Sequence, residues 1–278
     1  TAYGDYPHYL PDVKVDDHKH RFTGWMLLSK DKPVRSNSVL TGIERNVADE
    51  HEMGNMPEQE SPNYSVEMIN DENIRTLWVA ESNSDSIWFE MDLERIMTIN
   101  ALQINFQDFN ANIFGKPDTL RQQFIIETSE DGEKWNVAVD FSENSEDRPH
   151  AYIELENPLQ ARYIRSANKY FPNKYLASGE FRVFGNGNGD APQTPNSFNA
   201  VRQNDSRNAD VVWIAVDDAM GYVLYWGIEP DKLNNSVLIY SENSYELRAL
   251  TKGQEYYLAV DAFNENGISS KTEIIHIK

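Results

Sequence analysis

The feature that most constrains the fold is an alternation of apolar and polar residues with a period of two, which recurs between residues 25 and 185. In the clearest run, Ile87, Phe89, Met91 and Leu93 alternate with Ser86, Trp88, Glu90 and Asp92. This period places alternate side chains on opposite faces of a strand, so the run predicts a strand with one buried face. Similar runs lie at 99–106, 124–128, 151–155, 163–166 and 181–184, with no long amphipathic helix between them. The sequence therefore predicts an all-β fold, an antiparallel sandwich or jelly roll.

A second all-β domain is predicted after a polar segment rich in glycine and proline. That segment, 187–197, has almost no apolar residue, which is typical of a linker. Beyond it, residues 198–278 show short strands again, with Trp213 on an early strand, as in a small immunoglobulin-like sandwich. The predicted boundaries are 1–24 for an extension from a preceding domain, 25–186 for the first domain, 187–197 for the linker and 198–278 for the second domain. Residues 44–63 are acidic and without periodicity, which predicts a long loop.

Charge and composition exclude several classes of function. The 278 residues include 25 Lys and Arg against 45 Asp and Glu, a net charge of −20. This charge repels a phosphate backbone and an anionic membrane surface, so no nucleic acid partner and no membrane insertion are expected. No apolar run approaches the roughly 18 residues of a membrane-spanning helix, and the absence of cysteine excludes disulfides and thiolate metal sites. The chain begins at Thr1 without an apolar signal core, which predicts a processed product or an excised piece.

Five segments of the first domain, in order, resemble the discoidin family, also called the coagulation factor V/VIII type C family, of galactose-binding-like jelly rolls. They are NDENIRTLW at 70–78, IWFEMDL at 87–93, FIIETSEDGEKWNV at 124–137, ARYIRS at 161–166 and SGEFRVFG at 178–185. The second domain resembles a fibronectin type III module, through residues spread from Trp213 to Gly267. This second resemblance implies that the hydroxyl of Tyr256 ties the chain back to the backbone, as in a tyrosine corner.

Further segments, taken in order along the chain, resemble a more specific group of proteins than the two domain families. GDYPH at 4–8, GWMLLS at 24–29, YWGI at 225–228 and FNENGIS at 263–269 look like the C-terminal part of bacterial family 43 glycoside hydrolases of the xylosidase or arabinosidase type. In such proteins a five-bladed propeller carries the catalysis and modules like these follow it. The resemblance implies a non-catalytic carbohydrate-binding or positioning region of an exported polysaccharide-degrading enzyme. Its partners would be a glycan and an upstream catalytic domain, and no catalytic residue is predicted in this chain.

The discoidin resemblance also implies a structural Ca²⁺ site. Ca²⁺ takes 6–8 oxygen ligands, so an acidic loop such as 70–78 would need a distant carboxylate to complete the shell. The resemblance places Asp71, Asn73, Thr76 and Glu180 around the ion, the asparagine through its side chain or its backbone. The alternative is an acidic Asx-turn in the loop, with Glu180 in a surface ion pair.

A sugar-binding surface is expected from the loops at one end of the first domain. Such surfaces need an aromatic face for the sugar ring and a few polar groups for its hydroxyls. The loops at 107–120 and 168–178 carry both. The candidates for stacking are Phe109, Phe114, Tyr170, Phe171 and Tyr175, and the candidates for hydrogen bonding are Asn110, Asn112, Lys169 and Asn173. The alternative is that these aromatic rings pack against an upstream propeller or against the second domain. Trp78, Trp88 and Trp135 are expected in the core, because they lie on strand-like segments.

Two other functions stay open. A purely structural scaffold, which docks on a catalytic domain without binding sugar, would show the same aromatic residues as a flat apolar patch without convergent polar groups. A hydrolase within this chain would need a cleft with two opposed carboxylates, and among 45 acidic residues the sequence singles out no such pair. The motifs His51-Glu52 and His18-x-His20 lack the further ligands of a zinc site.

Overall fold

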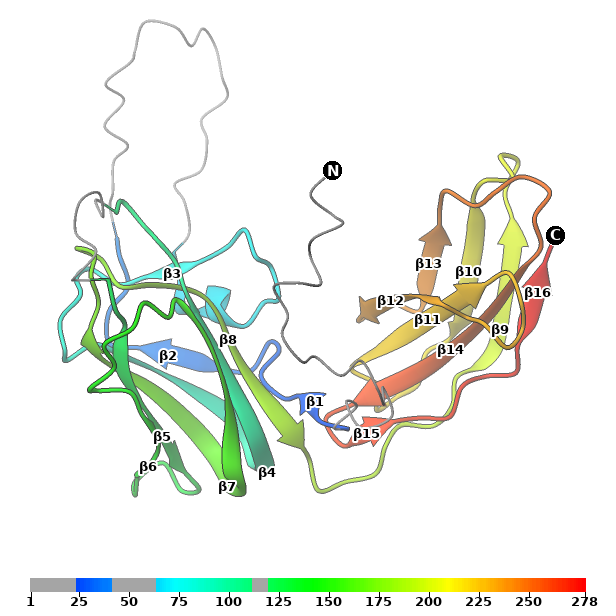
Figure 1. Ribbon diagram of the computed structural model, residues 1–278. Coiled ribbons are helices and arrows are strands. Elements are labelled where there is room, and N and C mark those ends of the chain that lie inside the picture. The colour runs from blue at the N-terminus through cyan, green and yellow to red at the C-terminus, as the bar shows by residue number, and fades with distance from the viewer. Residues whose placement is uncertain (1–23, 42–63, 112–119) are drawn as a thin grey trace, which may run out of the picture.

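The computed structural model describes residues 24–41, 64–111 and 120–278, and the structural statements below concern these residues (Figure 1). In them the protein is all-β, as predicted, with one short 3₁₀ helix, η4 (Val66–Ile69). The strands of the first domain are β1 (Met26–Leu27), β2 (Val34–Ser36), β3 (Trp78–Val79), β4 (Trp88–Phe106), β5 (Gln123–Ser129), β6 (Asn136–Asp140), β7 (His150–Tyr170) and β8 (Ala177–Asn186). Among these described residues, no helix is long and apolar enough to cross a membrane.

The first domain is one antiparallel sheet that folds back on itself. Its two longest strands, β4 and β7, pair along nearly their whole length, with the register interrupted between Asp92 and Met97. Before this irregularity β4 also pairs with β2, and after it β4 pairs with β8. Phe89 in the first part of β4 and Phe181 in β8 meet edge to face, with ring centroids 5.0 Å apart. The two parts of the sheet therefore form the two layers of a β-sandwich with the core between them (Figure 1).

The alternation in β4 is confirmed. Ile87, Phe89, Met91 and Leu93 are all buried in the core of the sandwich, and Trp78 is fully buried as well. The expectation that Trp88 and Trp135 lie in the core is wrong. Both are partly exposed on the outer face of the first layer. There they flank the guanidinium of Arg165, whose central carbon is 5.0 Å and 3.9 Å from their ring centroids.

The second domain is a pair of facing sheets. Its strands are β9 (Asn196–Arg202), β10 (Ala209–Ile214), β11 (Gly221–Gly227), β12 (Asn235–Tyr240), β13 (Ser244–Leu247), β14 (Tyr256–Asn264), β15 (Gly267–Ile268) and β16 (Ile275–Ile277). One sheet has the order β13-β10-β9, and the other has the order β12-β11-β14-β15 with β16 beside β14. Trp213 and Tyr222, one from each sheet, meet with ring centroids 5.1 Å apart in a separate core. The resemblance of this domain to a fibronectin type III module stays a prediction.

Two tyrosine hydroxyls tie loops of the second domain to its strands. The Tyr256 hydroxyl accepts a hydrogen bond from the backbone N–H of Thr251 at 3.2 Å, which is the kind of tie predicted for this residue. The Tyr222 hydroxyl accepts a shorter one, 2.8 Å, from the N–H of Val216. Tyr222 is 4% exposed, whereas Tyr256 is partly exposed and its hydrogen bond lies at the surface.

An unpaired hydrogen-bond donor costs more free energy when it is buried, so the two tyrosine hydrogen bonds should contribute differently to the stability of the domain. We expect Tyr222→Phe to lower the free energy of unfolding by about 1–2 kcal/mol and Tyr256→Phe by about 0.5 kcal/mol. Urea denaturation followed by tryptophan fluorescence measures both variants. A larger loss for Tyr256→Phe would show that burial does not rank these two hydrogen bonds.

The two domains share an apolar interface. Phe263, in β14 of the second domain, is 6% exposed and belongs to the core cluster of the first domain. Met220, Val223 and Tyr240 are partly buried against the same cluster. The interface therefore continues the first core instead of being a wet contact between two surfaces.

Polar contacts surround this apolar centre. The carboxylate of Glu265 binds the ammonium of Lys32 and the guanidinium of Arg95, both of the first domain, at 2.5 Å each. The connecting segment is held as well, since the N–H of Gly187 donates to the carbonyl of Glu265 at 2.7 Å. A Cβ at Gly187 would lie 2.2 Å from the side-chain oxygen of Asn266, so any larger residue there would have to displace that side chain. The connection thus packs on the second domain along part of its length.

Candidate functional site

The predicted calcium ligands of the loop before β3 lie together. The carboxylate of Asp71 accepts hydrogen bonds from the backbone N–H of Asn73 at 2.9 Å and from the hydroxyl of Thr76 at 2.8 Å. The Thr76 hydroxyl is also 2.6 Å from the carbonyl oxygen of Asn73. Carboxylate, hydroxyl and carbonyl oxygens are thereby gathered at one side of the loop, which are the ligand types that Ca²⁺ prefers.

Glu180 brings a buried charge toward this loop. It lies in β8, is 2% exposed, and neither of its carboxylate oxygens has a hydrogen-bond partner. Burial raises the pKa of Glu180 to about 7, and the neighbouring carboxylates of Glu72 and Asp71 raise it as well, against the lowering effect of Arg182. The Asx-turn of the alternative is present, because the Asp71 carboxylate accepts the N–H of Asn73, and Glu180 does pair with Arg182 at 3.9 Å, but this carboxylate is buried and not at the surface.

The nearest guanidinium does not neutralise Glu180 fully. Arg182 binds Glu72 through two hydrogen bonds of 2.7 Å and 2.9 Å, while its distance to the Glu180 carboxylate is 3.9 Å. A buried carboxylate without hydrogen bonds is costly unless a cation completes its surroundings. The chemistry of these groups, a buried carboxylate without hydrogen bonds and the oxygen ligands of the Asp71 loop, therefore fits a hard cation.

The rest of a calcium shell would have to come from neutral oxygens. In the described part of the chain, no three His, Asp or Glu side chains lie close enough together to hold a metal by themselves. A Ca²⁺ ion beside Glu180 would also need the Thr76 hydroxyl and main-chain carbonyls, which this ion accepts readily.

An aromatic cluster lies at the end of the first domain formed by the loops that precede β3, follow β4 and precede β8. Phe109 is its centre, with the ring of Tyr64 at 5.0 Å and the ring of Tyr175 at 5.7 Å between centroids, both edge to face. All three side chains are partly exposed. Tyr64 was not predicted, because it follows an acidic segment without periodicity that gives no sign of its partners.

Hydrogen bonds fix the loops that carry this cluster. The side-chain amide of Asn83 donates to the carbonyls of Phe171 and Asn173, at 3.1 Å and 2.7 Å. The amide of Asn173 in turn donates to the carboxylate of Asp108 at 2.8 Å. Three loops are thereby held together, so the rings of Phe109 and Tyr175 are presented by a fixed framework.

The other predicted sugar-binding residues have different surroundings. Phe171 is 2% exposed and packs against Phe106, with centroids 5.5 Å apart, so the expectation that its ring stacks on a sugar is wrong. The ring of Tyr170, at the end of β7, lies 4.5 Å from the guanidinium carbon of Arg121. Asn110 is exposed beside Phe109, in a left-handed conformation with φ of 49°. Asn112 and Phe114 lie outside the described residues, as do the histidine motifs at 18–20 and 51–52.

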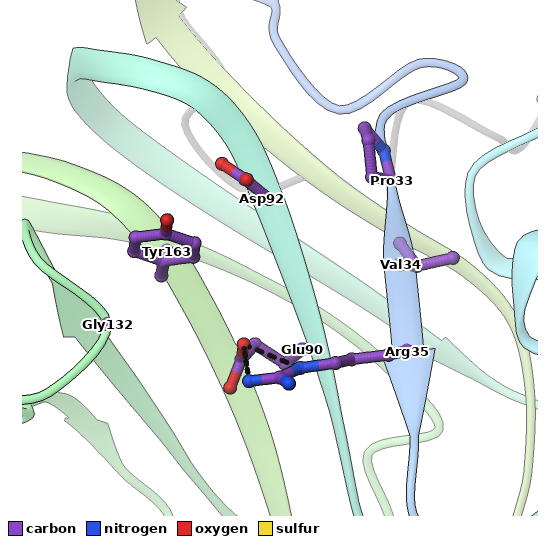
Figure 2. A pocket seen from close by; sticks show the side chains of 7 residues that line it. All are labelled: Pro33, Val34, Arg35, Glu90, Asp92, Gly132 and Tyr163. Atoms are coloured by element: carbon purple, nitrogen blue, oxygen red, sulfur yellow. Dashed lines mark hydrogen bonds and ion pairs between the residues drawn. The ribbon is translucent and has the colours of Figure 1, made fainter.

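A hollow of 380 Å³ opens on the outer face of the first layer, beside β2 and the first part of β4 (Figure 2). It is lined by Pro33, Val34, Arg35, Glu90, Asp92, Gly132 and Tyr163. The Glu90 carboxylate binds Arg35 at 2.6 Å and Arg165 at 2.7 Å, on its two oxygens. Sequence analysis did not single out this surface, because its residues come from β2, β4, β7 and the turn after β5.

Two carboxylates face this hollow, as a glycoside hydrolase would require, but neither has the surroundings of a general acid. Asp92 binds Arg162 through two hydrogen bonds of 2.7 Å and 2.8 Å, and these hold its pKa below the usual range. A general acid needs the opposite, a raised pKa. Glu90 lies two residues away on the same strand, so the pair does not face each other across a cleft.

The folded-over sheet and its loops define the first domain as a β-sandwich that presents aromatic residues at one end. Residues 55–176 match the sequence model of the F5/8 type C domain. This part of the chain is thus similar to an F5/8 type C, or discoidin, domain, in agreement with the resemblance of its motifs. No curated protein matches the chain significantly.

Solved structures similar to the chain include carbohydrate-binding modules. One is chitosan-binding module 1 of a chitosanase/glucanase from Paenibacillus sp. IK-5, with 16% identity, 58% of this chain and 99% of that chain covered, and a TM-score of 0.42. Another is the family 32 module of Clostridium perfringens NanJ in complex with galactose, with 11% identity, 58% and 98% covered, and a TM-score of 0.40. A third is the C. perfringens module CpGH89CBM32-4 in complex with GlcNAc-α-1,4-galactose, with 14% identity, 59% and 96% covered, and a TM-score of 0.42.

Proposed function

We propose that this chain is a non-catalytic carbohydrate-binding region in which the F5/8 type C domain holds a glycan at its loop end. The observation that carries the proposal is the convergence of Tyr64, Phe109 and Tyr175 from three separate segments into one partly exposed cluster. Aromatic faces bind the apolar side of a sugar ring, and rigid loops reduce the entropy lost on binding. The hydrogen bonds of Asn83 and Asn173 supply that rigidity.

Polar groups beside the rings favour sugar binding over a purely structural scaffold. The ammonium of Lys174 lies 4.7 Å from the ring centroid of Tyr175, and Asp108 and Asn110 are exposed next to Phe109. A patch that only docks on another protein would need no such arrangement. Donors and acceptors around an aromatic ring are instead what the hydroxyls of a sugar require.

The proposal also covers the longer enzyme to which this region would belong and a structural Ca²⁺ ion. We infer from the motif resemblance that this region belongs to an exported family 43 glycoside hydrolase whose catalytic propeller lies upstream. Ca²⁺ would bind between Glu180 and the loop of Asp71, Asn73 and Thr76, where it would neutralise a buried carboxylate. Its role would be structural, since these residues belong to the loop and strand that hold β3 against β8.

Affinity gel electrophoresis of the full chain tests glycan binding at the loop end. In gels that contain xylan, arabinan or galactan, we expect retardation by at least one polysaccharide. Phe109→Ala should abolish it, because this ring contacts both of the others. The matched control is Tyr152→Ala, which removes a ring that is 52% exposed and lies away from the cluster. Retardation that survives Phe109→Ala would move the binding site elsewhere on the chain.

A further inference from the structure

The outer face of the first layer carries an array of aromatic and charged side chains that the loop-end site does not use. Trp88 and Trp135 hold Arg165 between them, and Arg165 holds Glu90. Among the described residues, Glu90 is 4% exposed although it lies on the outer face, since Arg35 and Arg165 cover it from both sides. These contacts fix the polar groups in place without closing the hollow beside them.

Figure 2 shows how the walls of this hollow are arranged. The ring of Tyr163 stands on one side and the ring of Pro33 on the other, while Val34 borders the hollow but packs against the core of the sandwich. The carboxylate of Asp92 lies toward one end, while the ion pair of Glu90 and Arg35 lies toward the other. Apolar sides with polar ends match a sugar ring, which has apolar faces and hydroxyls around its edge.

The polar side chains that line the hollow still have free hydrogen-bonding positions. Arg35 has five N–H donors, and its two hydrogen bonds to Glu90 use its Nε and one terminal nitrogen, while 68% of its side chain is exposed. Each carboxylate offers about four acceptor positions, of which Asp92 uses three, two for Arg162 and one for the backbone N–H of Glu94. The hollow can therefore both donate to and accept from a hydroxyl.

Size and charge narrow the class of ligand. A volume of 380 Å³ lies near the lower end of the roughly 300–1,000 Å³ typical of small-molecule sites, which suits one sugar residue of a chain. The two carboxylates that line it are each bound by arginines, Glu90 by Arg35 and Arg165 and Asp92 by Arg162, so the charged groups at the hollow largely neutralise one another and make no demand for a charged ligand. The ligand that fits is a neutral sugar.

We propose that the hollow bounded by Tyr163, Asp92, Glu90 and Arg35 is a second carbohydrate-binding site that takes one neutral sugar residue. Its ligand class is that of the proposed function, but its place on the chain is independent of the loop end. Two sites on one domain would let a single glycan chain, or two neighbouring chains, be held with greater avidity than either site alone.

Nuclear magnetic resonance of the full chain tests this site directly. The probes are galactose, N-acetylglucosamine, xylose and arabinose, each titrated separately into the Phe109→Ala variant, in which the loop-end cluster is disrupted. We expect at least one sugar to shift the Gly132 amide and the Trp135 indole N–H signals saturably. Tyr163→Ala should weaken that binding about tenfold or more, and Arg35→Gln, a change at a largely exposed side chain, should weaken it severalfold. Tyr152→Ala is the control, because Tyr152 lies in the part of β7 that pairs with the second part of β4.

The outcomes separate this site from the loop-end site. If none of the four sugars moves the Gly132 and Trp135 signals, or if Arg35→Gln and Tyr163→Ala leave the titration unchanged, the second site is wrong. Glycan retardation that needs Phe109 but not Tyr163 would support the loop-end site alone. Binding that needs Tyr163 but not Phe109 would support the sheet-face site alone.

Discussion

In excess Ca²⁺ the chain should melt several degrees higher than in excess chelator, and Glu180→Gln in the first domain should remove this difference. A ligand that binds only the folded state stabilises it by about 2.7 kcal/mol at a hundred times its dissociation constant. For a domain of this size, each 1 kcal/mol raises the melting temperature by roughly 2–4 °C. Differential scanning calorimetry of the full chain in the two buffers measures the effect.

In excess chelator, Glu180→Gln should instead stabilise the folded protein. Without a cation, the buried Glu180 carboxylate has no hydrogen-bond partner, so replacing it by a neutral amide should raise the free energy of unfolding at pH 8 by roughly 2–3 kcal/mol. The matched control is Glu90→Gln, which alters another buried glutamate that two arginines already neutralise. It should destabilise the domain equally in both buffers. If Glu180→Gln behaves like Glu90→Gln, or Ca²⁺ leaves melting unchanged, the metal site is wrong.

Phe263→Ala should separate the two domains into independently melting units. Phe263 is buried in the core of the first domain although it belongs to β14 of the second, with Tyr240 edge to face at 5.5 Å. Truncating a buried phenylalanine costs about 3–5 kcal/mol, and here much of that cost falls on the contact between the domains. We expect one calorimetric transition in the wild type and two in the variant, with faster proteolysis in residues 187–195.

A matched variant distinguishes uncoupling from simple destabilisation. Phe198→Ala removes a partly buried phenylalanine that packs against the core of the second domain. It should lower the stability of that domain without exposing the connecting segment to protease. A single transition in Phe263→Ala, with unchanged proteolysis, would show that the polar contacts of Glu265 hold the domains together by themselves.

Strand content was predictable because a period of two is a local property. Ile87 to Leu93 needed only neighbours in sequence to be recognised as a half-buried strand. The predictions for Trp88 and Trp135 failed because a residue on a strand was assumed to be buried, whereas half of the residues of such a strand face outward. Trp88 alternates in phase with the polar residues Glu90 and Asp92, so its phase placed it on the outer face, where Arg165 now covers part of it.

The sites depended on contacts that a single sequence does not display. Glu180 entered the metal prediction only through a family resemblance, because 104 or more residues separate it from the loop of Asp71 to Thr76. The contact of Tyr64 with Phe109 joins two loops on either side of β4, and Phe263 reaches the first core from the second domain. Such pairings follow from topology, and short-range periodicity gives no information about them.

Binding of the full chain to an array of neutral plant and host glycans is the most direct test of the proposed function. We expect signal above blank on a related group of glycans, lost in a variant that combines Phe109→Ala with Tyr163→Ala and kept in Tyr152→Ala. The double variant matters because it disrupts both the loop-end cluster and the sheet-face hollow. If the correctly folded wild type binds no glycan on the array, or if the double variant binds as well as the wild type, this chain does not bind carbohydrate through either surface.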